Sequence, residues 1–323
     1  MHKLYTAARS MSIPPMLADA LTWRPSAPLE PLKLAWLQRA GVEVAILRLD
    51  LIDPLISGNK WFKLTGHLNQ AARAGAGGVI SLGGAHSNHL HALAAAGKRF
   101  GFPTVGLLRG HPQQTPTVED AQAFGMQLHW LGYAGYRARH AADFWVPWRE
   151  QYPGLQPIPE GGGGLLGALG CAVLVDSVRS QLARLDWDHY DAWWLAAGTG
   201  TTLAGLVLAE AGEHAVHGAL AVPDDHGVAQ NVAAVLDEAG CKRDDAACHL
   251  LQASRGGFAR TDTRLLAFIA QAEAEAGVPL EPLYTGKALL ALHEHISAGQ
   301  LQRGTRLIFV HTGGLQGRRA MGL

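Results

Sequence analysis

Two lysines lie close together in the mostly apolar decapeptide LISGNKWFKL, residues 55 to 64, of a chain that otherwise prefers arginine. Lys60 directly follows a Gly-Asn pair and Lys63 comes three residues later, whereas the whole chain has seven lysines and twenty arginines. A lysine buried beside apolar neighbours has a lowered pKa, because desolvation disfavours the ammonium form, and a neutral amine can attack an aldehyde. The alternative is that the two lysines share an exposed helix face.

A loop rich in glycine and threonine follows the apolar run AWWLAAG and precedes a helical pattern. It reads Gly198-Thr199-Gly200-Thr201-Thr202. Glycines let successive N–H groups point at one anion, and the helix N-terminus adds a favourable dipole. A plain cap needs only one such residue. The loop matches neither G-x-x-x-x-G-K-[ST] nor G-x-G-x-x-G, so we predict a monophosphate site and not a nucleotide site.

An amine that attacks an aldehyde and a loop that holds a monophosphate together point to one cofactor. Pyridoxal 5'-phosphate carries both the aldehyde and the phosphate, so we predict it as the cofactor of an enzyme. The alternative from another class is a protein that binds a phosphorylated metabolite or pyridoxal phosphate without turnover.

A third candidate segment is the turn GGAHSNHLH, residues 83 to 91. Ser87 and Asn88 lie where a helix cap belongs, and capping is one account of them. The functional account is that donors at this helix start bind a carboxylate or a ring oxygen. His86, His89 and His91 do not share one helix face, and no cysteine or carboxylate cluster accompanies them, so we predict no metal.

Short apolar runs that alternate with helical patterns must position these segments. We expect strands within residues 42–52, 77–84, 103–110, 126–132, 192–198, 216–222 and 306–314, and helices within 60–75, 87–101 and 201–212. The middle runs are apolar on both faces, as in parallel strands covered on each side. This alternation predicts an α/β fold with right-handed crossovers.

The clearest break in composition is YPGLQPIPEGGGG, residues 152–164, which we interpret as a crossing between lobes or a mobile edge of the site. We therefore divide the chain into a small domain, residues 52–158, and a large cofactor-binding domain made of residues 1–51 and 159–323.

The bulk composition excludes several classes of protein. The 323 residues carry 27 basic and 27 acidic side chains, which argues against binding to nucleic acid or to an anionic membrane surface. Three cysteines without C-x-x-C spacing are typical of a reducing compartment. No apolar run approaches bilayer length, and we predict a cytoplasmic protein.

Taken together, five segments make the sequence resemble a known family. SGNKWFKL, SLGGAHSNHLHALAAAG, IPEGGGGLLGALG, AAGTGTTLAG and LYTGKALLAL occur in the order found in the 1-aminocyclopropane-1-carboxylate deaminase/D-cysteine desulfhydrase family. The resemblance covers about residues 42 to 316. It implies pyridoxal phosphate dependence and the tryptophan synthase β-like fold, fold type II, with two open parallel-sheet lobes. It also implies a homodimer.

The resemblance assigns roles to the candidate residues. It implies that Lys60 forms the internal aldimine and that Lys63 helps to hold the phosphate, together with residues 198 to 202. Asn88 would contact the ring oxygen of the cofactor. Ser87 and His89 would lie near the substrate carboxylate, with Ser87 a candidate proton relay.

The motif Tyr284-Thr285-Gly286-Lys287 bears on the reaction. In the family, the residue after this tyrosine faces the pyridine nitrogen, and deaminases that open the cyclopropane ring resemble one another in having Glu there. Thr285 places a neutral hydroxyl at this position, as in the D-cysteine desulfhydrases. A less electron-withdrawing ring suits β-elimination, because the carbanion is relieved by loss of a leaving group.

Two departures from the family pattern concern the substrate side. A second active-site tyrosine lies 26 residues before the first in the family, and the ungapped match here is Phe258, which we expect beside the substrate. Glu160 and the four glycines after it are a further variation near the expected pocket.

These residues imply a lyase acting on a small amino acid, with D-cysteine as the best single prediction. Lys60 or Ser87 would take the Cα proton, and Tyr284 would protonate the departing thiol, which leads to pyruvate, ammonia and sulfide. Ring opening of 1-aminocyclopropane-1-carboxylate and amino-acid racemisation on the same scaffold are the enzymatic alternatives.

Overall fold

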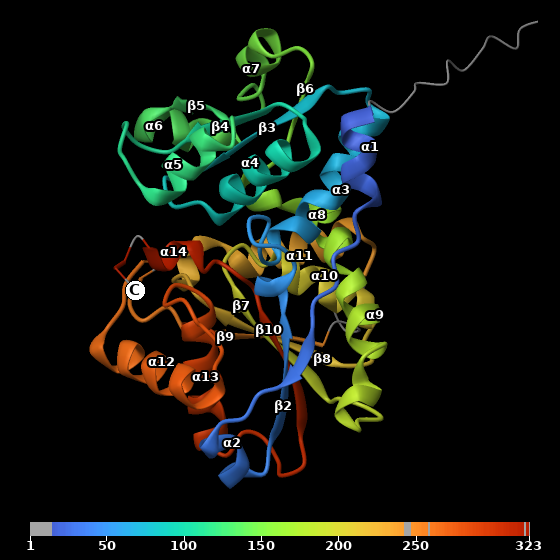
Figure 1. Ribbon diagram of the computed structural model, residues 1–323, viewed down its shortest axis with the longest axis vertical. Coiled ribbons are helices and arrows are strands. Elements are labelled where there is room, and N and C mark those ends of the chain that lie inside the picture. The colour runs from blue at the N-terminus through green and yellow to red at the C-terminus, as the bar shows by residue number, and fades with distance from the viewer. Residues whose placement is uncertain (1–14, 242–246, 258, 320, 323) are drawn as a thin grey trace, which may run out of the picture.

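The computed structural model describes residues 15–241, 247–257, 259–319 and 321–322, and shows two sheets one above the other with helices between and around them (Figure 1). The larger sheet has six strands in the order β1-β2-β10-β7-β8-β9. All neighbouring pairs are parallel except β1 with β2. In this order, the strands are β1 (Leu29–Pro31), β2 (Glu43–Arg48), β10 (Arg306–His311), β7 (Ala192–Ala197), β8 (Ala215–Leu220) and β9 (Cys248–Gln252).

The smaller sheet has four strands in the order β5-β4-β3-β6, all parallel. They are β5 (Gln127–Trp130), β4 (Thr104–Leu108), β3 (Gly78–Gly83) and β6 (Leu155–Pro157). Each of the seven segments expected as strands overlaps one strand of the described chain, with β8 beginning one residue earlier than expected, and the predicted α/β class is confirmed. Three strands were not predicted from the sequence: the short strands β1 and β6, and the longer strand β9.

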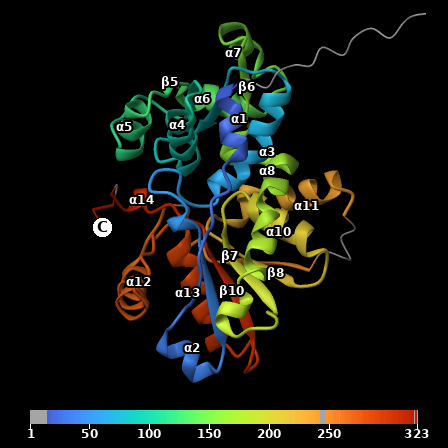
Figure 2. The ribbon, with the colours of Figure 1, turned by 45° about the vertical axis from the view of Figure 1, so that its right-hand side comes forward.

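The helices follow the strands in the expected alternation. They are α1 (Pro15–Thr22), α2 (Ala35–Ala40), α3 (Lys60–Arg73), α4 (Asn88–Phe100), α5 (Pro116–Ala123), α6 (Gly132–Arg137), α7 (Val146–Gln151), α8 (Gly164–Cys171), α9 (Val173–Arg179), α10 (Thr201–Glu210), α11 (Val228–Glu238), α12 (Thr263–Ala276), α13 (Thr285–Ser297) and α14 (Gln316–Arg319). The helices expected within 60–75, 87–101 and 201–212 are confirmed as α3, α4 and α10. Helix α1 packs against α3 and α4 (Figure 2).

The larger sheet is covered on both faces, which explains its apolar strands. Trp193 and Trp194 are neighbours in β7, both are fully buried, and they belong to two separate apolar clusters. Successive side chains of a strand point to opposite faces, so one tryptophan packs on each side. Helices α12 and α13 contribute to the cluster of Trp194, and α8, α9 and α10 to that of Trp193.

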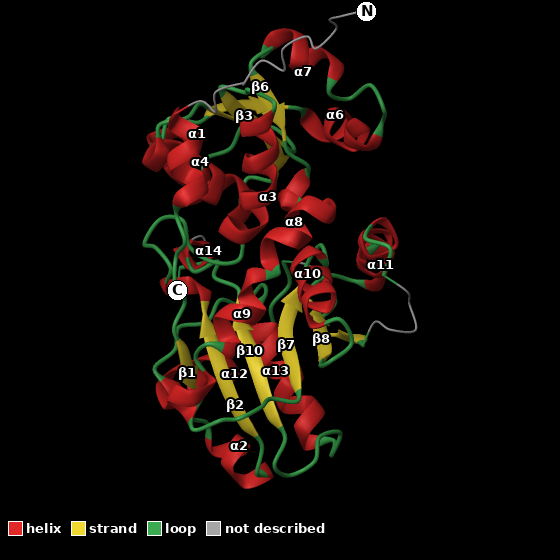
Figure 3. Ribbon diagram, turned by 90° about the vertical axis from the view of Figure 1, so that its right-hand side faces the viewer, coloured by secondary structure: helices red, strands yellow, loops and turns green. Residues whose placement is uncertain are grey.

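Helices α3, α8 and α10 fill the space between the two sheets (Figure 3). Glycines allow α3 and α8 to approach closely. A Cβ on Gly66 would lie 2.2 Å from the carbonyl oxygen of Leu166, and one on Gly170 would lie 2.0 Å from that of Phe62. Any larger residue at either position would push the helices apart. This contact fixes α3, whose first turn carries both lysines of interest.

All four strands of the smaller sheet lie within residues 52–158, and the six strands of the larger sheet lie in the flanking segments. The domain boundaries themselves stay a prediction. The stretch 152–164, expected as a lobe crossing, also forms β6 and a 3-10 turn at Glu160–Gly162. In the described part of the chain, no helix has the length and apolar composition needed to cross a membrane.

Candidate active site

A pocket lies where the segments after β7 and β10 meet the first turns of α3, α4 and α10. The lining residues come from five separate parts of the sequence: Asn59, Lys60, Lys63, Asn88, Ala196, Ala197, Gly198, Thr199, Gly200, Thr202, Leu203, Tyr284, Thr312 and Gly313. Ligands of open α/β sheets bind at the carboxyl ends of the strands, as here. The fold therefore brings together the lysine, loop and turn segments that the sequence analysis singled out.

Lys60 begins helix α3 and faces the pocket. The preceding Gly58, at φ 83°, lets the chain pass close to residue 312, since a Cβ there would lie 2.3 Å from the carbonyl oxygen of Thr312. Asn59 donates from Nδ2 to the Thr202 hydroxyl at 2.9 Å, and its Oδ1 lies 3.3 Å from Nζ of Lys60. Burial lowers the pKa of Lys60 to about 8. Near neutral pH, the neutral fraction of this amine is therefore larger than that of an exposed lysine.

Lys63 lies one turn further along α3 and is 3% exposed. Its ammonium group donates to the Thr199 hydroxyl at 3.2 Å. Burial, and then the charge of Lys60, hold the pKa of Lys63 well below its usual range. A positive charge on both lysines would be unfavourable in this buried site unless an anion joined them, so the pair fits a negatively charged ligand.

The glycine-threonine loop supplies donors opposite Lys63. Gly200, at φ 79°, takes the left-handed conformation from which α10 starts, and no side chain caps that helix. The first N–H groups of α10 therefore remain open to a ligand, and the helix dipole favours an anion. The hydroxyls of Thr199 and Thr201 lie 3.0 Å apart. This donor set fits a phosphate group.

The turn at residues 87 to 89 begins helix α4, as expected. Ser87 is its N-cap and accepts from the N–H of Leu90 at 3.2 Å. Asn88 lines the pocket, whereas the imidazole of His89 turns toward β3. Its Nε2 lies 2.8 Å from the Ser81 hydroxyl, which donates to the carbonyl of Ile158. The predicted substrate contacts of Ser87 and His89 stay predictions.

The three histidines of this turn have different surroundings. His89 bonds Ser81, His91 bonds Asp120 at 3.0 Å, and His86 is exposed. Burial, with Lys60 and Lys63 nearby, holds the pKa of His89 well below its usual range. Its buried Nδ1 has no hydrogen-bond partner among the described residues.

Tyr284 lines the pocket beside Gly198, and a Cβ on that glycine would lie 2.9 Å from the tyrosine ring. Burial, and then the charges of Glu281 and Glu160, raise the pKa of Tyr284, so its hydroxyl keeps its proton across the physiological range. Thr285 is fully buried and is absent from the pocket lining. Its predicted place opposite the pyridine nitrogen stays a prediction.

Glu281 is a functional candidate that the sequence analysis missed. This carboxylate is 2% exposed and accepts from the N–H groups of Leu283, Tyr284 and Thr285 at 2.6 to 3.1 Å. The Thr285 hydroxyl also bonds it at 3.2 Å. Burial raises the pKa of Glu281, and these donors act against that rise. The available signal was an acidic residue four positions before Thr285, where helix α13 begins.

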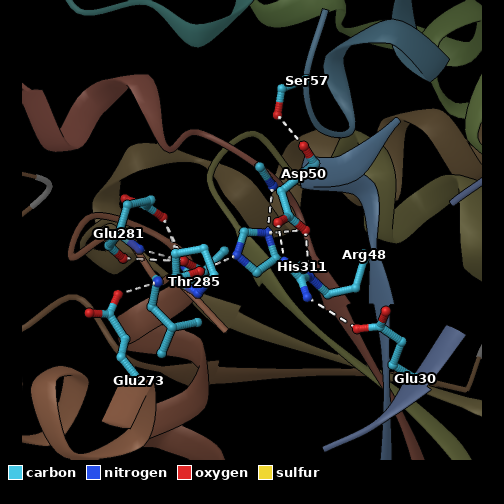
Figure 4. A network of polar contacts seen from close by, with 11 residues as sticks. Glu30, Arg48, Asp50, Ser57, Glu273, Glu281, Thr285 and His311 are labelled. Atoms are coloured by element: carbon cyan, nitrogen blue, oxygen red, sulfur yellow. Dashed lines mark hydrogen bonds and ion pairs between the residues drawn. The ribbon is translucent and has the colours of Figure 1, made fainter. Parts of the chain in front are cut away.

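Figure 4 shows a network of polar contacts that reaches the pocket through Gly313. His311 ends β10, is fully buried and lies 2.7 Å from the carbonyl of Pro279 through Nε2. Its Nδ1 accepts from the N–H of Gly313, a lining residue, at 3.2 Å and lies 3.3 Å from Asp50. Arg48 holds Asp50 with two hydrogen bonds of 2.9 and 2.7 Å. Burial lowers the pKa of His311 and favours the neutral ring.

Glu160 lies near the pocket, as its effect on Tyr284 indicates. Its carboxylate accepts from the Tyr136 hydroxyl at 2.6 Å and from Nε of Arg139 at 2.8 Å. The glycines that follow cover Lys63 and His89, because a Cβ on Gly162 would lie 3.1 and 3.5 Å from them. Phe258, expected beside the substrate, lies outside the described residues.

Comparison with known proteins agrees with this geometry. The sequence profile of the family described as "Pyridoxal-phosphate dependent enzyme" matches residues 26–313. The chain belongs to this family. It is 30% identical, over 98% of its length and 89% of the relative's, to the bifunctional D-cysteine desulfhydrase/1-aminocyclopropane-1-carboxylate deaminase, mitochondrial, of Arabidopsis thaliana. The predicted deaminase/desulfhydrase membership and the pyridoxal phosphate dependence of the family are thereby confirmed.

Solved structures identify the fold. An ACC deaminase homologue superposes with a TM-score of 0.77 at 26% identity, over 94% of this chain and 96% of that one. Threonine deaminase isoform 2 of Solanum lycopersicum shares the fold alone, with a TM-score of 0.63 at 17% identity over 95% and 87% of the chains. The predicted fold type II architecture is confirmed.

Proposed function

We propose that this protein is a pyridoxal phosphate-dependent lyase that releases a β-substituent from a small amino acid, with D-cysteine as the first substrate to test. The observation that carries the cofactor assignment is the pair of lysines in one pocket. Lys60 offers a partly neutral amine, and Lys63 faces the glycine-threonine loop through Thr199. When bound, pyridoxal phosphate withdraws electrons from the α-carbon of an amino acid joined to it.

In this proposal, residues of the chain bind and move protons around that α-carbon. The loop 198–202 and Lys63 hold the phosphate, and Asn88 donates to the ring oxygen. The amine of Lys60, with Ser87 as the alternative, removes the α-proton. Tyr284, whose raised pKa keeps its hydroxyl protonated, gives that proton to the leaving group.

Two other reactions are the alternatives within the same proposal. Ring opening of 1-aminocyclopropane-1-carboxylate is supported equally by the Arabidopsis relative, whose name joins both activities. Racemisation would use the same α-proton without loss of a substituent. We prefer elimination because of the hydroxyl of Thr285 at the position where ring-opening relatives have a carboxylate.

The cofactor is tested by borohydride reduction of the yellow protein followed by peptide mapping. We expect the adduct on Lys60. An adduct on Lys63 or Lys287, or a colourless protein that pyridoxal phosphate does not restore, would overturn the assignment. A phosphometabolite-binding protein without turnover would then be the better account.

The substrate is tested by product analysis with the yellow protein. D-Cysteine should yield pyruvate, ammonia and sulfide in equal amounts. Formation of 2-oxobutyrate from 1-aminocyclopropane-1-carboxylate with no sulfide from D-cysteine would favour the deaminase. Loss of optical rotation without any keto acid would identify a racemase.

We also expect a homodimer in the cytoplasm. The dimer is supported by an apolar groove beside α8 and α9, where Leu169 is 49% and Val173 is 51% exposed. Isolated large apolar side chains are common on surfaces, but adjoining ones along a groove are typical of an interface. Light scattering at micromolar concentration tests the expected mass of two chains.

A further inference from the structure

The side-chain amide of Asn88 has one of its two ends already engaged by the protein. Its Oδ1 accepts from Nε2 of Gln316 at 2.8 Å. Its Nδ2 lies on the side of Gly314, where a Cβ would approach to 2.9 Å. Within the described part of the chain, Nδ2 donates no hydrogen bond. Asn88 and Lys60 line the same pocket, so this amide offers a donor to the pocket that holds the reactive amine.

Gln316 comes from a short helix that is fixed at both of its sides. At the end of α14, Arg318 bonds Glu273 and donates to the carbonyl of Leu280 at 2.8 Å, and Arg319 pairs with Asp120 on α5. Figure 1 shows α14 between the smaller sheet's helices and α12. Gln316 therefore meets Asn88 from a fixed direction.

We propose that Gln316 is a positioning residue: it holds the Asn88 amide with the N–H group, and not the oxygen, available to the ring oxygen of pyridoxal phosphate. This inference rests on the proposed function. The ring oxygen neighbours the carbon that carries the aldehyde, so a donor beside Lys60 is placed to reach it. If the Asn88 amide turned over while Gln316 kept its orientation, Nδ2 would meet the Nε2 donor of Gln316, and an oxygen would face the ring oxygen. Both contacts are repulsive.

Gly314 completes the device. Its backbone is left-handed, at φ 87°, and the absence of a side chain leaves the space that Nδ2 of Asn88 occupies. A larger residue there would displace the amide even with Gln316 in place. The segment after β10 thus positions the Asn88 amide in two ways. Gln316 donates a hydrogen bond to it, and Gly314 leaves space for its Nδ2.

The experiment measures the dissociation constant of pyridoxal phosphate by titrating the cofactor-free protein, and records the visible band of the complex against pH. Gln316→Glu keeps the size but replaces the donor with an acceptor, and should weaken binding about tenfold. It should also raise the pH midpoint of the band, because the ring oxygen loses a donor. Gln316→Leu should have a smaller effect. Gln302→Leu, at an exposed glutamine, should change nothing.

A double-mutant cycle with Asn88→Ala separates positioning from a general structural effect. If Gln316 acts through Asn88, then Gln316→Glu should change neither quantity in the Asn88→Ala background, while thermal unfolding stays the same in all variants. An equal effect of Gln316→Glu in both backgrounds would overturn the inference. So would the absence of any effect in a protein whose yellow colour and borohydride adduct on Lys60 show that the cofactor is bound. Either outcome would leave the proposed function intact. Failure of the unaltered protein to bind pyridoxal phosphate would overturn both.

Discussion

Two regions of the molecule keep lysines away from bulk solvent, and they treat the ammonium group differently. In the first turn of α13, Lys287 is 1% exposed and donates to the carbonyls of Ser254 and Gly257 at 2.9 Å and of Ala221 at 3.4 Å. In the pocket, the contacts of Lys60 and Lys63 are with one side-chain oxygen each, at 3.3 and 3.2 Å. Burial lowers the pKa of both Lys60 and Lys287 to about 8.

The similar pKa values show that burial alone does not distinguish a reactive lysine from a structural one. The difference lies in the partners. Carbonyl oxygens around Lys287 satisfy the ammonium geometry and tie together the loops after β8 and β9. The pocket lysines keep donor capacity for a ligand. Variants of the two groups should therefore fail in different ways.

The largest effect is expected for Lys60→Met. Without the amine there is no covalent attachment and no base at the α-carbon, so turnover should fall about a thousandfold or more. Borohydride should then leave no adduct. Lys33→Met, at an exposed lysine, is the matched control and should keep full activity. Substantial turnover by Lys60→Met would show that Lys60 is not the reactive lysine.

Lys287→Met should act on stability. It leaves buried carbonyls of Ser254 and Gly257 without their donor, which should lower the free energy of unfolding by about 3 kcal/mol. Urea denaturation of the cofactor-free protein measures this loss. A variant of unchanged stability that had lost its visible band would instead place Lys287 in the chemistry.

Lys63→Met should weaken the binding of pyridoxal phosphate about 10- to 100-fold, because it removes one charged donor to the phosphate. The matched comparison is a ligand: pyridoxal, which lacks the phosphate, should bind equally well to both proteins. If pyridoxal binding weakened to the same extent, Lys63 would serve the ring or the fold and not the phosphate.

The smallest effect concerns pH and the cofactor-free protein. The pKa of Lys60 in the folded state, about 8, lies below the usual lysine value of 10.5, so the unfolded chain binds more protons between these values. Stability should accordingly rise as the pH increases from about 8 to 10.5. Lys60→Met should reduce this rise and stabilise the protein at pH 7 by about 1 to 2 kcal/mol. Urea denaturation of both proteins at pH 7 and pH 10 measures these two effects. An equal rise in stability with pH in Lys60→Met would contradict the lowered pKa of Lys60.

The sequence predicted those parts of the structure that depend on local pattern. The runs around β3, β4 and β7 are apolar on both faces and are followed by glycines, and each formed a strand where expected. Lys60, Lys63, Asn88 and the loop 198–202 could be named because each follows or begins a regular element. Strand β6 has three residues, two of them next to prolines or glycines, and its pairing with β3 is visible only in three dimensions.

The missed residues share a different property. Glu281, His311 and Gln316 act through partners distant in the sequence or through backbone groups, such as the contact of Gln316 with Asn88 across 228 positions. No periodicity or spacing in the sequence indicates the distant contacts of His311 and Gln316. Thr285 is a predicted site residue whose hydroxyl also bonds Glu281, a contact that the motif did not indicate.

The position of β10 in the larger sheet has a consequence for biosynthesis. This strand, Arg306–His311, lies between β2 and β7 and separates strands made much earlier. The smaller sheet, by contrast, uses only residues 78 to 157. During translation the smaller sheet has all its strands long before the larger one can close, and β2 and β7 wait with unpaired edges. Because Thr312 and Gly313 follow β10, the ribosome must add them before the pocket can receive its cofactor.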